Sequence, residues 1–316
     1  MPRTPVAQLG INMMLRRQPF LLREKSLSTT RSGTDLMRLV LADRSGSIPA
    51  VQFDASSYLY ESLATGQGVE VSGRVEEFRG SLQIKIEQIF AAELGDLGEY
   101  LPVAFRPIEE MEQELAGLLA SVRRPDLQRL LKATLGDAET YAAFVRAPAA
   151  KFYHHACLGG LLEHTLGVAR LVQAASHLYP EMDRDLALTL ALLHDLGKIR
   201  AYDALSFDLT EEGNLWGHLY ITASLVERAI DGLDGFDPEL GRLVVHGLLA
   251  HHGRREHGSP VVPMTIEAIV THHADALDAD ARGAIDHLSR ADLETEAFTG
   301  WSDMHETRLY RGAEGS

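Results

Sequence analysis

Cysteine is almost absent from this chain, since Cys157 is the only one among 316 residues. A single thiol excludes an intramolecular disulfide framework and any zinc site built from several cysteines. Long apolar runs are also missing: residues 186–193 fall far short of the roughly 20 residues that span a bilayer. The first 15 residues lack the apolar stretch of a signal peptide. These absences predict a soluble, cytoplasmic protein without a membrane segment.

Positive charge is in short supply, because the formal net charge is −15. Taken globally, this charge argues against a protein that coats nucleic acid. The two parts of the chain differ, however. Residues 16–92 hold ten Lys and Arg against nine Asp and Glu, a balance of +1, whereas residues 93–316 hold 19 against 36, a balance of −17. The length and this asymmetry predict two domains with different roles.

Apolar and polar residues alternate in the first part of the chain, as half-buried β-strands require. The pattern is clearest at residues 69–75 and 82–87, with a hairpin turn at 78–81 between them. Three further strands and one short helix are predicted upstream, at residues 20–28, 35–42, 48–53 and 55–63. Five strands with a helix between the third and the fourth predict an OB-type β-barrel, a fold often used to bind oligonucleotides.

The periodicity becomes helical from about residue 108, as the spacing of Leu115, Leu118 and Val122 illustrates. Before that point, residues 93–107 contain two glycines and two prolines, which is typical of a linker. The sequence therefore predicts a multidomain protein, with an N-terminal barrel followed by an all-α domain. The expected boundaries are 16–92 for the barrel, 93–107 for the linker, 108–290 for the helical domain and 291–316 for a C-terminal tail.

Histidine is concentrated in the helical part, where 13 of the 14 histidines lie between residues 154 and 287. One isolated histidine is more often a packed or solvated side chain than a ligand. His164, however, falls on the core-facing side of a helix, and His194-Asp195 and His251-His252 each end an apolar helix. Burying such groups is costly unless each has a partner. A divalent metal satisfies all of them at once, and these ligands suit Mn, Fe, Co, Ni or Zn.

The series His164, His194-Asp195, His218, His251-His252 and Asp275 resembles that of the HD-domain metal phosphohydrolases. The resemblance narrows to the YhaM-type 3′→5′ exoribonucleases, which also carry an OB-type domain ahead of the HD domain. It covers about residues 18–290 and rests on five stretches: HHACLGGLLEHT at 154–165, LLHDLGK at 192–198, EEGNLWGH at 211–218, HHGRREHGSP at 251–260 and HHADALDA at 272–279.

This resemblance implies two divalent metal ions, with Mn favoured and Co, Fe, Ni and Zn as alternatives. The first would be held by His164, His194, Asp195 and Asp275. The second would be held by Asp195 as a bridge, together with His218, His251 and His252. Two metals suit phosphodiester hydrolysis, and the implied activity is stepwise removal of nucleoside 5′-monophosphates from the 3′ end of single-stranded RNA.

Other residues of the matching stretches have two interpretations each. Lys198 either stabilises charge on the phosphate or forms an ion pair with a neighbouring carboxylate. His154, His155, His272 and His273 either support the ligands and face the substrate or simply pack.

The predicted barrel offers a surface for the RNA. Arg38, Arg74 and Lys85, with Phe53 and Phe78, are expected to face outward and to form a groove with aromatic platforms for stacking bases. The alternative is an ordinary solvated sheet face. The oligomeric state is left open, a homo-oligomer included.

Three other functions fit parts of the pattern. The same ligands would serve a nucleotide phosphohydrolase that acts on dNTPs or alarmones, although a barrel for oligonucleotides has no evident use there. A cyclic-dinucleotide phosphodiesterase is disfavoured, because no Gly-Tyr-Pro triplet follows His251-His252. A non-catalytic RNA-binding protein is disfavoured because every ligand position holds a competent residue.

Overall fold

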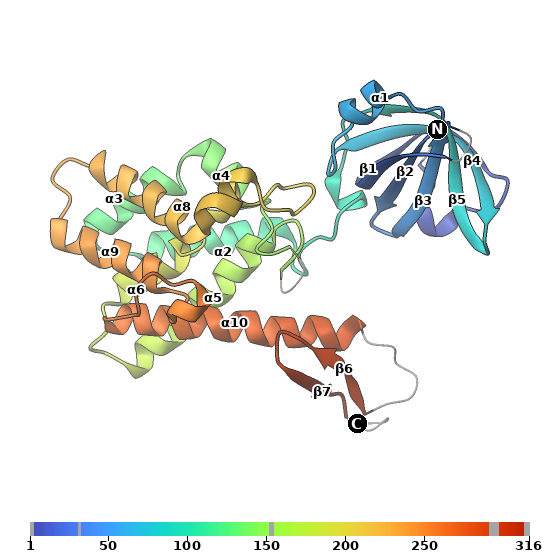
Figure 1. The fold of residues 1–316 in the computed structure, drawn as a ribbon. Coiled ribbons are helices and arrows are strands. Elements are labelled where there is room, and N and C mark those ends of the chain that lie inside the picture. The colour runs from blue at the N-terminus through green and yellow to red at the C-terminus, as the bar shows by residue number, and fades with distance from the viewer. Residues whose placement is uncertain (1–2, 31–32, 152–154, 291–296, 313–316) are drawn as a thin grey trace. The chain divides into compact units, whose positions relative to one another are not determined.

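A computed structural model of the chain describes residues 3–30, 33–151, 155–290 and 297–312. The chain divides into two compact units, Met1–Val103 with Leu205–Phe207, and Ala104–Ala204 with Asp208–Ser316. Figure 1 shows a β-barrel in the first unit and a helical body in the second. No described helix is long and apolar enough to cross a membrane.

The first unit is a closed barrel with the strand order β1-β2-β3-β5-β4. A short helix, α1 (Ser57–Ser62), connects β3 to β4. The predicted five-stranded OB-type barrel is therefore confirmed. Its strands and flanking 3-10 turns are η1 (Val6–Gln8), β1 (Met14–Thr29), β2 (Asp35–Asp43), β3 (Gly46–Phe53), β4 (Gly68–Phe78), β5 (Ser81–Ala91) and η2 (Leu97–Glu99).

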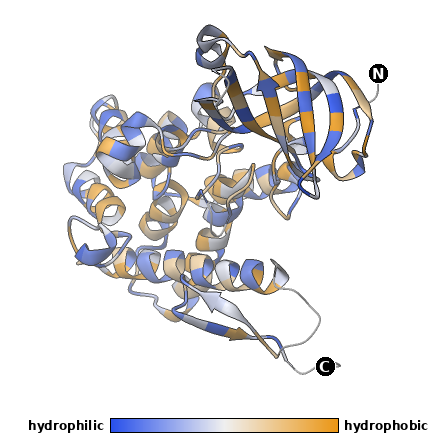
Figure 2. Ribbon diagram, turned by 45° about the vertical axis from the view of Figure 1, so that its right-hand side comes forward, coloured by the Kyte–Doolittle hydropathy of each residue, from blue (hydrophilic) through white to orange (hydrophobic). Residues whose placement is uncertain are grey.

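The barrel strands alternate because every second side chain fills the interior. Val69, Val71 and Val75 of β4 are fully buried, and the alternation of colours along the strands is visible in Figure 2. β1 begins six residues earlier than the strand predicted at 20–28. A bulge between Leu15 and Gln18 interrupts its pairing with β4, so the period of two is broken there.

The second unit is helical, as predicted, and ends in a small hairpin. Its helices and strands are α2 (Ile108–Ser121), α3 (Pro125–Thr134), α4 (Ala138–Phe144), α5 (Gly160–Leu178), α6 (Arg184–Leu193), α7 (Lys198–Ala201), α8 (Glu211–Asp231), α9 (Pro238–Ala250), η3 (Arg255–His257), α10 (Ile266–Arg290), β6 (Phe298–Ser302) and β7 (Thr307–Tyr310).

Helix α6 lies in the middle of this unit, in contact with α3, α5, α9 and α10. All eight of its residues from Leu186 to Leu193 are buried, which is why the helix is apolar on every side. His194 and Asp195 follow directly at its C-terminal end and are themselves buried. The fold therefore brings these two polar residues to the centre of the helical unit.

The β6–β7 hairpin falls within the predicted tail, residues 291–316. It is antiparallel and packs on α10, where His305 Nε2 lies 2.9 Å from the backbone oxygen of Asp280. A Cβ atom on Gly283 of α10 would lie 2.4 Å from the sulfur of Met304, so this glycine permits the close contact.

Candidate metal centre

Asp195 lies at the middle of the candidate site with its side chain only 2% exposed. Its Oδ2 atom is 3.2 Å from His194 Nε2 and 3.5 Å from His164 Nε2. Its Oδ1 atom is 3.4 Å from His218 Nε2 and 3.6 Å from His251 Nε2. One carboxylate therefore presents one oxygen to each of two histidine sets.

The first set consists of His164, His194, Asp195 and Asp275, of which the first three are almost fully buried and the Asp275 side chain is 16% exposed. The Nε2 atoms of His164 and His194 lie 3.2 Å apart, and Asp275 Oδ1 lies 3.1 Å from His164 Nε2. Asp275 is placed there by α10. The structure thus brings together all four residues predicted for the first metal.

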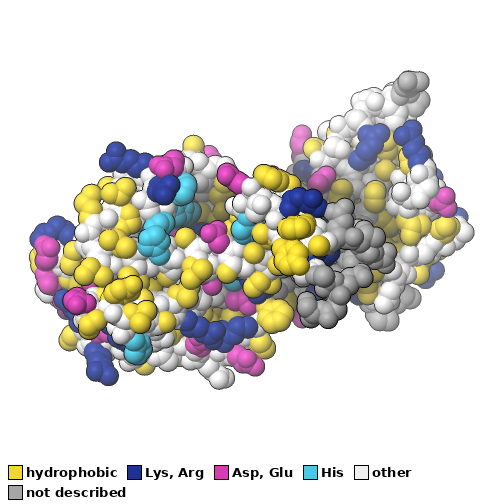
Figure 3. All heavy atoms as spheres, turned by 90° about the horizontal axis from the view of Figure 1, so that it is seen from below, with side chains coloured by type: hydrophobic (Ala, Val, Ile, Leu, Met, Phe, Trp, Pro, Cys, Tyr) yellow, Lys and Arg dark blue, Asp and Glu magenta, His cyan; other side chains and the backbone are white. Residues whose placement is uncertain are grey.

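The second set consists of His218, His251 and His252, whose ring nitrogens lie within 4.8 Å of one another. The Nε2 atoms of His218 and His252 are 3.2 Å apart. His218 follows a kink in α8 at Gly217, where φ is 72° and ψ is 150°. The members of this set differ in exposure, because the His218 side chain is 18% exposed and that of His251 is fully buried. Figure 3 shows histidine side chains reaching the surface beside acidic ones.

Helix ends fix two of the ligand imidazoles. His194 Nδ1 donates to the backbone oxygen of Ala191 at 2.9 Å, and His251 Nδ1 donates to that of Leu248 at 2.6 Å. Each bond satisfies a carbonyl in the last turn of α6 or α9. With the Nδ1 proton engaged, the Nε2 atom carries the lone pair that faces the centre.

The turn after Asp195 packs directly against α8. A Cβ atom on Gly197 would lie 2.5 Å from both the His218 oxygen and the Thr222 nitrogen. The amide of Gly197 also donates to Thr222 Oγ1 at 2.8 Å. Glycine at this position therefore allows Asp195 and His218 to come together.

Two buried polar atoms of the site, Asp195 Oδ1 and His251 Nε2, have no hydrogen-bond partner. Leaving such atoms unpaired costs free energy. An imidazole lone pair and a carboxylate oxygen are both hydrogen-bond acceptors, so they cannot pair with each other. Both bind divalent metals of the first transition row. The side chains at this site therefore fit a metal.

Comparisons with known proteins agree with this geometry. A family model described as HD domain matches residues 161–280, and one described as OB-fold nucleic acid binding domain matches residues 22–91. The protein named 3′-5′ exoribonuclease YhaM of Bacillus velezensis is 34% identical over 267 residues, which cover 83% of this chain and 84% of the relative. This chain belongs to the YhaM family.

Parts of several solved structures are similar to the N-terminal region of this chain. The second OB-fold domain of replication protein A from Methanococcus maripaludis is 21% identical and covers 30% of this chain and 98% of its own, with a TM-score of 0.24. PriB from Ralstonia solanacearum is 18% identical and covers 26% of this chain and 100% of its own, with a TM-score of 0.22.

The electrostatics of this YhaM-family site favour a cation. Burial lowers the pKa of His164, but hydrogen bonds to Asp195, Asp275 and Asp278 raise it well above its usual value. Three carboxylates that hold a proton so firmly also attract a metal ion. In the second set, burial lowers the pKa of both His218 and His252, which favours the neutral imidazoles that bind metals. Burial also lowers the pKa of His251, but the hydrogen bond and charge of Asp195 raise it above its usual value.

Lys198 is also buried, and its Nζ atom lies 2.7 Å from Asp195 Oδ2. This geometry is the ion pair that the sequence offered as one of two interpretations. Burial would raise the pKa of the Asp195 carboxyl, but the Lys198 ammonium and then His194 lower it well below its usual value. Asp195 is therefore ionised across the neutral range.

Sequence reasoning missed Asp278, one turn beyond Asp275 on α10. Its Oδ2 atom lies 2.7 Å from His164 Nδ1 and 3.1 Å from His155 Nε2. The i, i+3 spacing from Asp275 was the available signal, because it places both carboxylates on one face. Of the other histidines, His272 Nδ1 donates to the His251 oxygen at 2.8 Å, His273 is exposed, and His154 lies outside the described residues.

The barrel residues predicted to bind RNA gather on one outer face. Arg38 pairs with Val51, Val51 with Lys85, and Lys85 with Arg74 across the four strands β2, β3, β5 and β4. We call Arg38, Lys85 and Arg74 the cationic row. Because directly paired residues point to the same side of a sheet, the three cations lie in line.

The two predicted aromatic residues flank a groove of about 480 Å³ on this barrel. Phe53 and Phe78 line it together with Arg38. Phe53 and Phe78 are 49% and 54% exposed, and Lys85 Nζ lies 5.8 Å from the centre of the Phe53 ring. Three of the five predicted residues therefore line one groove, and Lys85 lies close to its Phe53 wall with Arg74 paired beside it.

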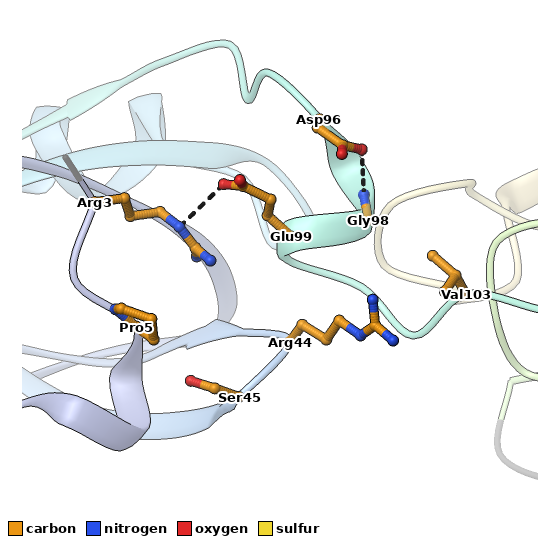
Figure 4. A pocket seen from close by; sticks show the side chains of 8 residues that line it. All are labelled: Arg3, Pro5, Arg44, Ser45, Asp96, Gly98, Glu99 and Val103. Carbon is orange, nitrogen blue, oxygen red and sulfur yellow. Dashed lines mark hydrogen bonds and ion pairs between the residues drawn. The ribbon is translucent and has the colours of Figure 1, made fainter.

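A second hollow in the first unit, of about 530 Å³, is shown in Figure 4. Arg3 at its wall pairs with Glu99 at 3.1 Å and with Asp43 at 3.0 Å. Asp96 accepts the amide of Gly98 at 2.9 Å. The Arg3–Glu99 pair joins the N-terminal segment to the segment after β5.

Cys157 gives a prediction that is independent of the metal. Burial raises the pKa of its thiol to about 12, with Glu163 adding to the effect. A free thiol has a pKa of about 8.5, so at pH 8 the thiolate, and hence alkylation, should be reduced roughly a thousandfold. Mass spectrometry after iodoacetamide treatment should find Cys157 unmodified in the folded protein and modified in guanidinium. Rapid labelling of the folded protein would contradict this prediction.

Proposed function

We propose that this chain is a metal-dependent 3′→5′ exoribonuclease that shortens single-stranded RNA and releases nucleoside 5′-monophosphates. The observation that carries the proposal is Asp195, whose two oxygens face two separate sets of ligands. Membership of the YhaM family supports the reaction, and the OB-fold barrel supports the substrate class.

The proposed ligands divide as the family resemblance implies. His164, His194, Asp195 and Asp275 would hold one ion, and Asp195 with His218, His251 and His252 would hold the other. Bound divalent ions would supply Lewis-acid activation of water and phosphate. We propose Mn²⁺, with Co, Fe, Ni and Zn as alternatives, because imidazole and carboxylate ligands suit these metals.

The chain's own groups prepare the site for this chemistry. The bonds from His194 and His251 to backbone oxygens keep their Nε2 lone pairs aimed at the centre. Lys198 holds Asp195 in its ionised form and restrains its orientation. Its ammonium also adds a fixed positive charge beside the position where negative charge develops on the phosphate.

The barrel is proposed to hold the RNA while the helical unit cuts it. The cationic row supplies phosphate contacts, and Phe53 and Phe78 supply surfaces on which bases stack. We retain 16–92 as the RNA-binding domain, 93–107 as the linker, 108–290 as the catalytic domain and 291–316 as the tail.

The proposal predicts the products of one experiment. Single-stranded RNA labelled at its 5′ end and incubated with the protein and Mn²⁺ should yield a ladder of labelled products, each one nucleotide shorter. Thin-layer chromatography of unlabelled reactions should find nucleoside 5′-monophosphates. EDTA should abolish both results, because metal removal disarms the site.

Two outcomes would contradict this function. Internal cuts would produce scattered fragments without stepwise shortening. Faster hydrolysis of dNTPs than of RNA by the same preparation would favour a nucleotide phosphohydrolase instead. Parallel incubation with single-stranded DNA of the same sequence separates ribonuclease from general nuclease activity.

A further inference from the structure

A continuous chain of buried polar groups leads away from the metal centre behind His164. Asp278 Oδ2 lies 2.7 Å from His164 Nδ1 and 3.1 Å from His155 Nε2. The other ring nitrogen of His155 lies 3.2 Å from Glu163 Oε2. The side chains of His155 and His164 are 4% and 1% exposed, so water does not substitute for these contacts.

Glu163 anchors the far end of this chain. Its Oε1 atom accepts the backbone amide of Arg106 at 3.2 Å. His155 itself adopts a left-handed backbone conformation with φ of 55°, which residues other than glycine rarely adopt. Its ring reaches both carboxylates from this conformation. This strained backbone conformation therefore places the imidazole between Glu163 and Asp278.

The neighbouring helix leaves room for Asp278. A Cβ atom on Gly167 of α5 would lie 2.0 Å from Asp278 Oδ1 and 2.7 Å from its Cγ atom. Any side chain at Gly167 would therefore push the carboxylate away from His164. The glycine lies one turn after His164 on the same helix, where an alanine would otherwise favour helix formation.

His155, His164 and Asp278 lie close enough together to hold a metal themselves. Their contacts favour another role. Among the described residues, the buried polar atoms without a partner include Asp195 Oδ1 and His251 Nε2 but none from these three side chains. His164 also directs its other nitrogen, Nε2, toward Asp195 and Asp275.

We propose that Asp278 is a positioning residue, which, held in place by His155, fixes the ring orientation of His164 and engages its Nδ1 proton. The nitrogen that faces the metal centre is then always Nε2. This inference rests on the proposed metal centre but not on the identity of the substrate. Carboxylates that hold a ligand histidine in this way typically contribute about 10- to 100-fold to metal affinity.

The test measures Mn²⁺ binding in the absence of RNA. Full-length protein is stripped with EDTA, desalted and titrated by calorimetry, and the melting temperature of the stripped protein is recorded. Asp278→Asn should weaken the tightest Mn²⁺ binding by about 10- to 100-fold. The matched control is Asp280→Asn, an exposed carboxylate on the same helix, which should bind Mn²⁺ as the wild type does.

Two further variants separate positioning from simple stability. Gly167→Ala should weaken Mn²⁺ binding because it displaces the Asp278 carboxylate without removing it. This variant tests the positioning role independently if Asp278→Asn lowers the melting temperature. His155→Gln should weaken binding in the wild-type background but not in the Asp278→Asn background, because it acts through Asp278.

Each outcome decides the matter. Mn²⁺ affinity within twofold of the wild type for both Asp278→Asn and Gly167→Ala would overturn the positioning role while leaving the metal centre standing. Equal, additive losses from His155→Gln in both backgrounds would overturn the link through Asp278. No Mn²⁺ binding by the wild type would overturn the proposed metal centre, and the positioning role with it.

Discussion

Replacing Asp195 with asparagine should reduce RNA hydrolysis at least about a thousandfold. Lewis-acid stabilisation of several kcal/mol depends on bound metal. Each loss of about 1.4 kcal/mol of this stabilisation slows the reaction tenfold. The asparagine keeps the volume of the side chain but presents only one oxygen and no charge. The two histidine sets would then share no carboxylate. Metal content after equilibrium dialysis against Mn²⁺, measured by plasma mass spectrometry, should fall together with activity.

Lys198 provides the control for this substitution. It is buried beside Asp195 Oδ2, so Asp195→Asn leaves an ammonium without its partner. Removing one member of a buried ion pair typically costs about 3–5 kcal/mol of stability. Adding Lys198→Met should restore the melting temperature of the metal-stripped protein without restoring hydrolysis. Full activity and full metal content in Asp195→Asn would refute the bridging role of this carboxylate.

Replacing the three residues of the cationic row with alanine should make RNA binding markedly less sensitive to salt. Each phosphate contact with a single strand contributes about −0.7 to the log–log slope of affinity against salt, so three contacts contribute about −2. Between 50 and 200 mM salt, wild-type affinity should therefore fall roughly 15- to 20-fold more than that of the variant. Fluorescence anisotropy of labelled RNA in EDTA measures this without hydrolysis.

The matched control removes the same charge elsewhere on the barrel. Arg16, Arg17 and Arg44 lie outside the row and are exposed. The log–log salt slope of their triple alanine variant should differ from the wild-type slope by less than the value of one phosphate contact, about 0.7. Equal slope changes in the two triple variants would mean that net charge, and not the row, governs binding.

The sequence pattern was sufficient for the barrel, whereas the proposed ligand set also needed the family resemblance. Strands such as β4 have one buried face, so the alternation of Val69, Val71 and Val75 reports their geometry directly. Part of the proposed ligand set was visible because polar residues such as His194 and Asp195 directly follow an apolar helix, whereas His218 and Asp275 were named from the resemblance alone. Both signals are local, and each depends on neighbouring residues in the chain.

The missed features depend on contacts between distant segments. The start of β1 was hidden because the bulge near Arg17, where φ is 47°, shifts the alternation by one residue. Asp278 looks like any acidic residue on a helix until Gly167, more than one hundred positions earlier, brings α5 against it. The kink at Gly217 that turns His218 toward Asp195 is likewise a backbone conformation without a periodic signature.

Barrel closure gives the cationic row a mechanical consequence. The barrel is closed between β3 and β5 by a parallel seam of two registered pairs, Ala50–Ile84 and Val51–Lys85, whereas β4 and β5 share ten. The seam is the shortest ladder in the barrel, and local opening favours the place with the fewest backbone bonds. Arg38 lies on one side of it, and Lys85 and Arg74 lie on the other. A polyanion bound along the row therefore bridges the β3–β5 seam. Because it binds the closed barrel, a higher occupancy of the ligand makes local opening of this seam less favourable by mass action.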